Sequence, residues 1–299
     1  MKLYDIGEDQ LLAQLLPDLP IGKAVVSGAG DDCAVVRTGD RREFLVLKTD
    51  CVVAGVHFLA RAGAREVGWK AMMRPLSDFA ATSALPQFAL ITLITPEQTK
   101  LEWVKELYRG VRRAANRFKV SVVGGETSSV PGPVAISVSV VGVVEPSRCV
   151  SRAGGKVGDD LFVTGRLGGA MKRKHLQFIP RIAESRWLTK NFSIHAMIDL
   201  SDGLGADLPR LAGASRLGFD VNTQNLPLTR GAKIDDAISE GEDYELLFAI
   251  SPRDRNRLER EWRKKFRKLA LTRIGSLSQR STKNNQLLQR GYIHFQKSG

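Results

Sequence analysis

The sequence predicts an α/β protein made of two α/β domains with mixed sheets, because strand-like and helix-like segments interleave in both halves. The chain has 299 residues, more than one hydrophobic core usually holds, so two domains are expected. A glycine-rich joint at 151–160 separates the two halves. We therefore expect one domain at residues 1–147 and a second at residues 148–299.

The first half begins with an amphipathic pattern that predicts a helix, which Pro17 and Pro20 end. Apolar runs then predict strands, and Pro96 opens a later helix. The last strand of this half alternates small and β-branched residues, and the strand before it should end at Gly124-Gly125-Glu126. The expected helices are 5–16, 66–84 (despite Pro75) and 97–118, and the expected strands are 43–49, 87–94, 120–123 and 134–144.

The second half repeats the alternation of strands and helices. Its last helix carries Leu258, Trp262 and Phe266 at intervals of four residues, which predicts one apolar face and one exposed basic face. The expected strands are 161–164, 196–198, 218–222 and 245–250, and the expected helices are 205–212 and 253–268.

Composition excludes several classes of protein. The hydrophobic fraction of 43% and charged fraction of 26% are ordinary for a globular protein. No run of 18 apolar residues predicts a membrane span, and the N-terminus lacks the apolar core of a signal peptide. Three cysteines without a Cys-x-x-Cys spacing indicate a reduced, cytoplasmic protein.

The formal net charge of +13 is concentrated near the C-terminus. Residues 251–299 hold 14 Lys plus Arg against 3 Asp plus Glu. A solvated basic face explains this excess, and attraction of a polyanionic substrate or a nucleic acid is the alternative.

Four short acidic segments carry the functional signal: 30–32, 48–50, 76–78 and 199–202. Each lies in apolar or glycine-rich sequence, where an isolated carboxylate is costly to desolvate. Gathered carboxylates repel one another unless cations lie between them. Oxygen ligands without histidine or thiolate partners favour Mg²⁺, which in enzymes usually accompanies a nucleotide phosphate.

The spacing of Asp199 and Asp202 lets both face one way at the start of a helix, where Ser201 can cap and backbone N–H groups can bind an anion. Carboxylates from both halves would then hold several Mg²⁺ ions around a polyphosphate between two domains. Such ions neutralise a phosphoryl group and fix an in-line geometry for its transfer.

Each segment also has a simpler explanation. Asp31-Asp32 can form a plain turn, Asp78 can face solvent, and Asp199 with Asp202 can be a capping arrangement. The same holds for the neighbours of these segments. His57 can be a histidine at the edge of the core, Gly124-Gly125 a tight turn, and Cys33 and Cys51 small buried residues.

Together the segments resemble the thiamine-monophosphate kinase family, whose superfamily includes aminoimidazole ribonucleotide synthetase and selenophosphate synthetase. The resemblance runs from Gly7 to Phe295. Its motifs are Gly-Ala-Gly-Asp-Asp at 28–32, Lys-Thr-Asp-x4-Gly-Val-His-Phe at 48–58, Gly-Trp-Lys-Ala-x4-Leu-Ser-Asp-x-Ala-Ala at 68–81, Val-Gly-Gly-Glu-Thr at 123–127, Ile-Asp-Leu-Ser-Asp-Gly-Leu at 198–204, Gly-Glu-Asp-Tyr-Glu-Leu-Leu-Phe at 241–248 and Gly-Tyr-x-His-Phe at 291–295.

The resemblance implies ATP-dependent phosphorylation of thiamine monophosphate to thiamine diphosphate, in a homodimer formed by the N-terminal domains. By motif position it assigns catalysis to Asp50, Asp78 and Asp202. It implies Mg²⁺ ligation by Asp32, Lys48 (through its carbonyl), Thr49, Asp50, Asp78, Glu126, Asp199 and Asp202. It implies ATP contacts from Tyr108, Gly125, Arg152 and Ser201, and thiamine-phosphate contacts from His57, Glu242 and Tyr292.

Two departures from the family pattern stand out. Glu126 replaces the usual Asp and shifts the ligand oxygen by ~1.5 Å, a large displacement for Mg²⁺. Residues 165–199 and 220–240 form shorter segments than the pattern has, and Gly169-Ala170 replaces its Gly-Asp-Ser/Ala. Loops over the thiamine pocket are therefore expected to be trimmed.

Two alternatives remain beside the kinase. A related enzyme would keep the ATP and Mg²⁺ site but act on another acceptor, although no nucleophilic cysteine or glycine-rich arm precedes Gly28. A non-catalytic protein that binds nucleotides or nucleic acids would use the basic C-terminal segment, but it would have no need of the intact acidic set.

Overall fold

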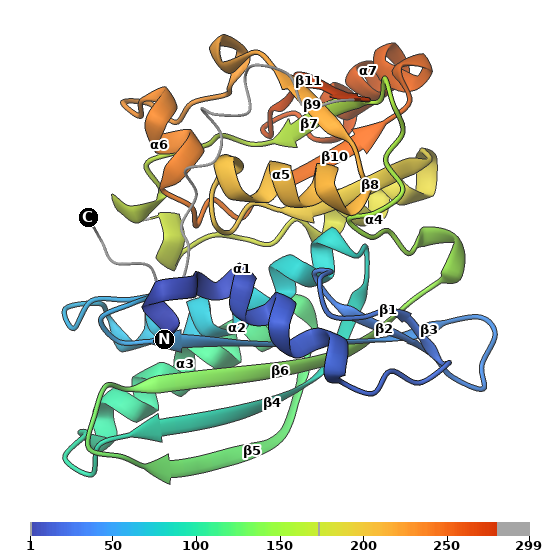
Figure 1. Ribbon diagram of the computed structural model, residues 1–299. Coiled ribbons are helices and arrows are strands. Elements are labelled where there is room, and N and C mark those ends of the chain that lie inside the picture. Colours follow the sequence, from blue (N-terminus) through green and yellow to red (C-terminus); the bar gives the residue numbers. More distant parts are fainter. Residues whose placement is uncertain (1, 173, 280–299) are drawn as a thin grey trace.

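Two sheets lie one above the other in the computed structural model, which describes residues 2–172 and 174–279 (Figure 1). The first sheet has the strand order β1-β2-β3-β6-β4-β5, in which only β4 and β5 run parallel. In sequence order these strands are β1 (Val25–Ser27), β2 (Ala34–Arg37), β3 (Phe44–Val53), β4 (Leu85–Thr95), β5 (Ser121–Ser129) and β6 (Ala135–Val144).

Two long helices accompany this sheet, α2 (Ala64–Ala81) and α3 (Leu101–Phe118). Helix α2 is buried along most of its length, because it packs against the first sheet and also contacts α4 and β8 of the second half. Helix α3 is amphipathic and packs closely on α2. Helix α1 (Leu3–Leu15) lies across the front of the molecule in Figure 1 and bends at Gly7, whose φ is +71°.

The second sheet is antiparallel and has the order β8-β10-β7-β11-β9. All residues of β7 and β10 are buried, so these strands form the centre of the second half. The strands are β7 (Asp160–Thr164), β8 (Ile194–Asp199), β9 (Gly218–Val221), β10 (Leu246–Ile250) and β11 (Leu271–Ser278). The helices are α4 (Ile182–Asn191), α5 (Leu204–Ala214), α6 (Ile234–Ser239) and α7 (Arg255–Lys265). Short 3₁₀ turns are η1 (Leu16–Asp18), η2 (Pro146–Arg148), η3 (Ala170–Lys172), η4 (Lys174–Leu176), η5 (Thr223–Asn225) and η6 (Pro252–Asp254).

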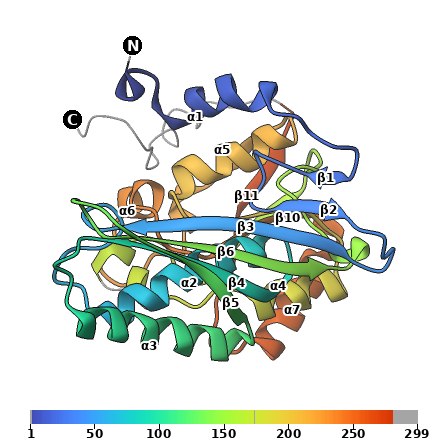
Figure 2. The same ribbon diagram turned by 90° about the horizontal axis from the view of Figure 1, so that it is seen from below.

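One hydrophobic cluster joins the two halves. It runs from the inner face of the first sheet through Leu76 and Phe79 of α2 to Leu188 of α4 and Phe248 of β10. A second cluster lies between the other face of the second sheet and α5. Among the described residues, no helix packs on the opposite face of the first sheet over β6 and β4 (Figure 2). Within residues 2–172 and 174–279, helices thus cover the first sheet on one face only.

The structure confirms the α/β class and the expected elements, but several elements end elsewhere; β3, for example, continues to Val53 and α2 stops at Ala81. Helix α3 begins at Leu101 rather than at residue 97, and α7 ends at Lys265, with a 3₁₀ turn before it. Strand β5 does not end at Gly124 but continues to Ser129. The sequence patterns did not indicate β1, β2, β11, α4 or α6, most of which are short or carry mixed polar and apolar residues.

Gly125 shows why β5 passes through the glycine pair instead of turning there. A Cβ atom on Gly125 would lie 1.8 Å from the carbonyl oxygen of Ile91 on β4. Only glycine allows this close approach of the two strands. The tight turn, which was one interpretation of Gly124-Gly125, is therefore wrong.

The surface follows the composition. Leu258 and Trp262 of α7 are buried, and most basic residues of this helix, including Arg260 and Arg263, are exposed. Cys33 is buried as expected, but Cys51 is exposed because it lies on the uncovered face of β3. No helix in the described part of the chain is long and apolar enough to cross a membrane.

Candidate active site

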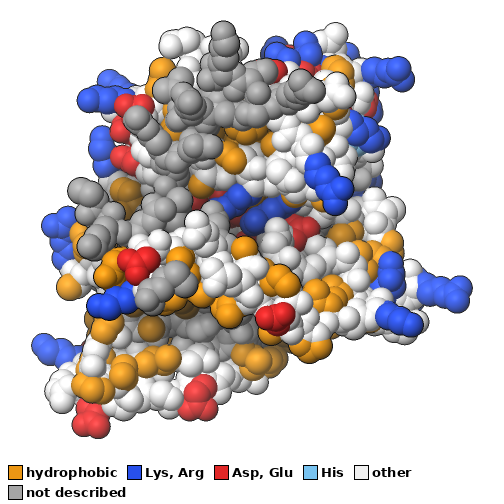
Figure 3. All heavy atoms as spheres, viewed as in Figure 1, with side chains coloured by type: hydrophobic (Ala, Val, Ile, Leu, Met, Phe, Trp, Pro, Cys, Tyr) orange, Lys and Arg blue, Asp and Glu red, His pale blue; other side chains and the backbone are white. Residues whose placement is uncertain are grey.

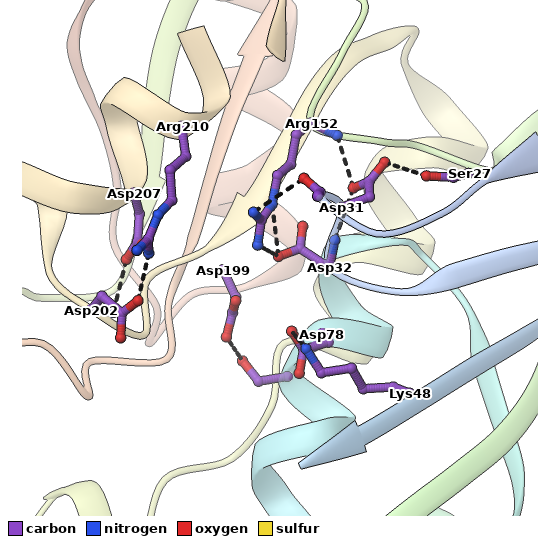
Figure 4. Close-up of polar contacts among 12 residues, drawn as sticks. Ser27, Asp31, Asp32, Lys48, Asp78, Arg152, Asp199, Asp202, Asp207 and Arg210 are labelled. Atoms are coloured by element: carbon purple, nitrogen blue, oxygen red, sulfur yellow. Dashed lines mark hydrogen bonds and ion pairs between the residues drawn. The ribbon is translucent and has the colours of Figure 1, made fainter. Parts of the chain in front are cut away.

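Three carboxylates from distant parts of the sequence meet between the two halves. Oxygen atoms of Asp32, Asp78 and Asp199 all lie within 4.8 Å of one another, and the three residues are buried. Asp32 precedes β2, Asp78 lies on α2 and Asp199 ends β8. Figure 4 shows the three side chains converging on one space. We call these three residues the acidic cluster.

The acidic cluster is only partly satisfied by the protein itself. Asp199 Oδ2 accepts a hydrogen bond of 2.6 Å from Ser77 Oγ, whereas Asp32 Oδ2 is buried without a hydrogen-bond partner. Burial and the charge of Asp32 raise the pKa of Asp199 to about 7. Burial also raises the pKa of Asp32 and, more strongly, that of Asp78, where further carboxylates add to the effect. A buried carboxylate oxygen without a partner is a candidate cation ligand.

Basic side chains surround the acidic cluster. Lys48 Nζ lies 2.9 Å from Asp78 Oδ1, and Arg152 donates to Asp32 Oδ1 at 2.7 Å. Burial alone would lower the pKa of Lys48, but Asp78 and Asp50 raise it above its ordinary value. Asp50 itself lies 3.8 Å from Arg74. The cleft therefore holds both the negative groups that bind metal ions and the positive groups that bind phosphate.

The pH dependence of stability tests the charge state of the cluster. The folded-state pKa of Asp199 is raised from 3.8 to about 7, so stability falls as pH rises through this window. Asp199→Asn removes the penalty, on the order of 4 kcal/mol. The melting temperature of the ion-free variant should therefore exceed that of the unmodified protein by a gap that widens from pH 4 to 7. Thermal unfolding in chelator measures this gap, and a constant gap would contradict the raised pKa.

The cluster opens into a cleft of about 750 Å³ between the two halves. Asp50, Arg74, Arg152 and Arg210 line it, and α1 closes one side through Glu8 and Leu12. In Figure 3, basic and acidic side chains meet in this hollow. A smaller cavity of about 100 Å³ shares Arg74 with the cleft and extends it.

This smaller cavity is lined by His57 and Glu242, which come from opposite halves of the chain. Glu242 Oε2 accepts from Lys70 Nζ at 2.5 Å and lies 2.9 Å from His175 Nδ1. Burial opposes ionisation of Glu242, but His175 and Lys70 lower its pKa overall. His57 Nδ1 accepts from the backbone N–H of Val53 at 3.0 Å. The cavity thus has an ionised carboxylate in its wall.

Asp202 and Ser201 lie differently from the expectation. Asp202 pairs with Arg210 rather than with the acidic cluster, and its backbone N–H donates to Asp207 (Figure 4). Helix α5 begins after Gly203, and no side chain caps it, so Ser201 is not the cap. The chain turns after Asp199, so that the side chain of Asp199 joins the acidic cluster whereas that of Asp202 pairs with Arg210. Both residues still line the cleft.

Thr49 and Glu126 do not reach the acidic cluster within one chain. Strand pairing aligns Asp50 with Val138, Ile91 and Gly125, so Glu126 lies on the opposite face of the sheet from Asp50. Two strands also separate β3 from β5, a distance of roughly 14 Å. Thr49 is on this uncovered face too, where its hydroxyl contacts those of Ser137 and Ser139.

Tyr108 also lies away from the cluster. It lines an open groove of about 560 Å³ between α3 and β5, with Arg112 and Val122. Tyr292 lies outside the described residues.

The structure thus brings together ten of the expected site residues around the cleft and its side cavity: Asp32, Lys48, Asp50, His57, Asp78, Arg152, Asp199, Ser201, Asp202 and Glu242. It places Thr49, Tyr108, Gly125 and Glu126 elsewhere.

The sequence patterns did not identify three residues near the cleft and its side cavity: Lys70, Arg74 and His175. Lys70 and Arg74 interrupt the apolar run of α2, and a charge in such a run can indicate a buried ion pair. His175 gave no signal because its segment carries no regular pattern.

Comparisons with known proteins agree with this geometry. Residues 30–144 match the family described as AIR synthase related protein, N-terminal domain. The chain is 33% identical over 296 residues to the thiamine-monophosphate kinase of Rhodopirellula baltica, covering 90% of this chain and 92% of that one. It is 34% identical over 285 residues to the thiamine-monophosphate kinase of Aquifex aeolicus, covering 85% of this chain and 89% of that one.

A solved structure shows a similar arrangement over nearly the whole chain. The structure of AaThiL complexed with AMPPCP and TMP superposes with a TM-score of 0.83 at 31% identity, and covers 98% of this chain and 99% of that chain. From this likeness and the two relatives, the chain belongs to the thiamine-monophosphate kinase family.

Proposed function

We infer that this protein transfers the terminal phosphoryl group of ATP to thiamine monophosphate and so forms thiamine diphosphate. The observation that carries the inference is the convergence of Asp32, Asp78 and Asp199 in a cleft that also holds basic side chains. The complex of AaThiL with AMPPCP, an ATP analogue, and TMP supports the same function. Phosphoryl transfer needs little besides positioning and charge compensation, which this cleft supplies.

Mg²⁺ fits the acidic cluster. The donors are hard carboxylate oxygens, and one of them, Asp32 Oδ2, is buried without a hydrogen-bond partner. Asp32, Asp78 and Asp199 would hold the metal, with Asp50 and Asp202 at the same cleft. Bound Mg²⁺ would neutralise phosphate charge. Lys48 and Arg152 now balance the carboxylates, and they would be free to bind phosphate oxygens once cations occupy the cluster.

The side cavity is the proposed acceptor site. Its wall contains the ionised Glu242, which attracts the cationic thiazolium of thiamine monophosphate. His57 lies at the junction of the side cavity with the cleft, because it lines both. With the acceptor in the side cavity, His57 would lie between the acceptor and the acidic cluster. Tyr292 is retained as a proposed contact from the family resemblance alone.

We further propose a homodimer formed through the uncovered face of the first sheet. Phe88 and Leu90 on this face are each 46% exposed, and every residue of the edge strand β5 is exposed. Exposed apolar side chains beside an open edge are typical of an interface. Glu126 lies on the same face as Leu90, so it could join an acidic cluster only across such an interface.

The proposed domains are residues 1–147 and 148–299. This division leaves each of the two sheets intact.

A charge on this face should prevent dimer formation. Leu90→Glu is expected to weaken self-association by at least about a hundredfold, because a carboxylate would be buried without a partner. Light scattering after size exclusion, over a range of concentrations, measures the change. Val157→Glu is the control, since Val157 is 59% exposed on the second half of the chain. An unchanged mass for Leu90→Glu would place the interface elsewhere.

The function is tested by incubating the protein with ATP, Mg²⁺ and thiamine monophosphate and separating the thiamine phosphates by chromatography. Thiamine diphosphate formed in proportion to ADP supports the kinase. Binding of ATP that depends on Mg²⁺, without thiamine diphosphate, would instead favour a related enzyme with another acceptor. Salt-sensitive binding of RNA without any Mg²⁺-dependent ATP binding would favour a non-catalytic protein.

We also propose a cytoplasmic location, because the proposed reaction uses ATP and the cysteines are free.

A further inference from the structure

Lys70 is a buried ammonium that none of the proposed catalytic or binding roles uses. It lies on α2 with none of its side chain exposed. Its Nζ donates to the carbonyl oxygen of His57 at 2.6 Å and to Glu242 Oε2 at 2.5 Å. Nζ also lies 3.0 Å from His175 Nδ1. The His57 carbonyl and the Glu242 carboxylate accept two of the three donors of this lysine, and His175 Nδ1 can accept the third only in the tautomer without a proton on that nitrogen.

These partners come from three segments that surround the side cavity. His57 follows β3, His175 lies in η4, and Glu242 precedes β10. Glu242 has a φ of +58°, an unfavourable conformation for a residue with a side chain, so its backbone needs support from the fold. The backbone N–H of Glu242 donates to the carbonyl oxygen of Ser201 at 2.7 Å, and its side-chain carboxylate accepts from Lys70.

We propose that Lys70 is a positioning residue that fixes Glu242 and the turn at His57 in the orientation needed to bind the phosphorylation acceptor. This inference rests on the proposed function, because it assigns the side cavity to the acceptor. Lys70 ties the two halves of the chain together at the acceptor end of the cleft. It does not line the cavity, so it acts through Glu242 and His57.

The charge of Lys70 is part of this role. The charged or titratable groups around it are Glu242, His175, His57 and Arg74. Burial lowers the pKa of Lys70 to about 8 despite the neighbouring carboxylate. Above this pH the ammonium is lost, and the support for Glu242 weakens with it.

Lys70→Met tests the proposal. The KM for thiamine monophosphate should rise by at least about tenfold, since a charged hydrogen-bond network is broken, while the KM for ATP stays within about twofold. In the unmodified protein the acceptor KM should rise above pH 8, and this rise should be absent from the variant. Lys70→Gln, which keeps a donor for the His57 carbonyl, is used if the Met variant does not fold.

Arg186→Met is a matched control. Arg186 also joins the two halves, through the carbonyl oxygen of Ser83 and the carboxylate of Glu145, and neither partner lines the cleft. It should lower the melting temperature and leave both KM values unchanged. Equal KM changes for acceptor and ATP in Lys70→Met would reduce Lys70 to a structural role and overturn the proposal.

A double-mutant cycle with Glu242→Gln asks whether Lys70 acts through Glu242. The effects of Lys70→Met and Glu242→Gln on acceptor binding, measured by calorimetry, should be less than additive. Additive effects would contradict the proposal. If the unmodified protein forms no thiamine diphosphate, the proposed function itself fails. Activity with an unchanged acceptor KM in Lys70→Met overturns only the role of Lys70.

Discussion

Asp199→Asn is expected to reduce turnover by about a thousandfold while the protein remains folded. The substitution keeps the size of the side chain and an oxygen that can accept from Ser77, but it removes one charge from the acidic cluster. Because burial and Asp32 disfavour the ionised carboxylate, the variant should be more stable than the unmodified protein above pH 7. Steady-state rates with ATP and thiamine monophosphate, together with thermal unfolding, measure both effects.

Asp159→Asn is the control for this substitution. Asp159 is also buried, but it pairs with His195 and does not line the cleft. The Asp159→Asn variant should be less stable than the unmodified protein but should keep its turnover. If Asp199→Asn retained near-normal turnover, Asp199 would have no part in the chemistry.

Gly110→Ala is expected to lower the free energy of unfolding by about 3 kcal/mol. Helices α2 and α3 cross where Gly68 and Gly110 bring their backbones together. A Cβ atom on Gly110 would lie 2.0 Å from the carbonyl oxygen of Arg65, and one on Gly68 would lie 2.0 Å from that of Leu107. The backbone cannot yield locally, so the helices would have to separate. Denaturant titration followed by circular dichroism measures the loss.

Gly213→Ala is the comparison for this prediction. Gly213 is also in a helix, α5, but a Cβ atom there would meet nothing within 4 Å. This variant should be more stable by up to about 1 kcal/mol, through its helix propensity. Equal stability of Gly110→Ala and the unmodified protein would show that the crossing of α2 and α3 is not as tight as described.

The acidic segments could be predicted from the sequence because a carboxylate in apolar surroundings has few explanations. Asp32, Asp78 and Asp199 are far apart in the chain, yet each lies in or beside apolar or glycine-rich sequence, and each is buried as that pattern requires. The α/β class was predictable because apolar strand patterns alternate with helical patterns along the chain. Strand β10, for example, is a continuous apolar run, and β7 has an apolar centre.

The sequence could not show which faces the remaining residues occupy. Glu126 is near the cluster by motif, but the pairing of β5 with β4 places it on the uncovered face of the sheet. Ser201 and Asp202 lie just before helix α5, as expected, but Gly203 is the N-cap and Asp202 pairs with Arg210. Such placements depend on strand register and on partners distant in sequence. Local patterns do not contain this information.

The most direct test of the acidic cluster is the binding of Mn²⁺, as a substitute for Mg²⁺, measured by electron paramagnetic resonance with the ATP analogue AMPPCP present. The unmodified protein should take up Mn²⁺ only together with the nucleotide. Asp32→Asn, Asp78→Asn and Asp199→Asn should each weaken this uptake at least about tenfold. Equal uptake by the unmodified protein and all three variants would contradict a metal site built from both halves of the chain.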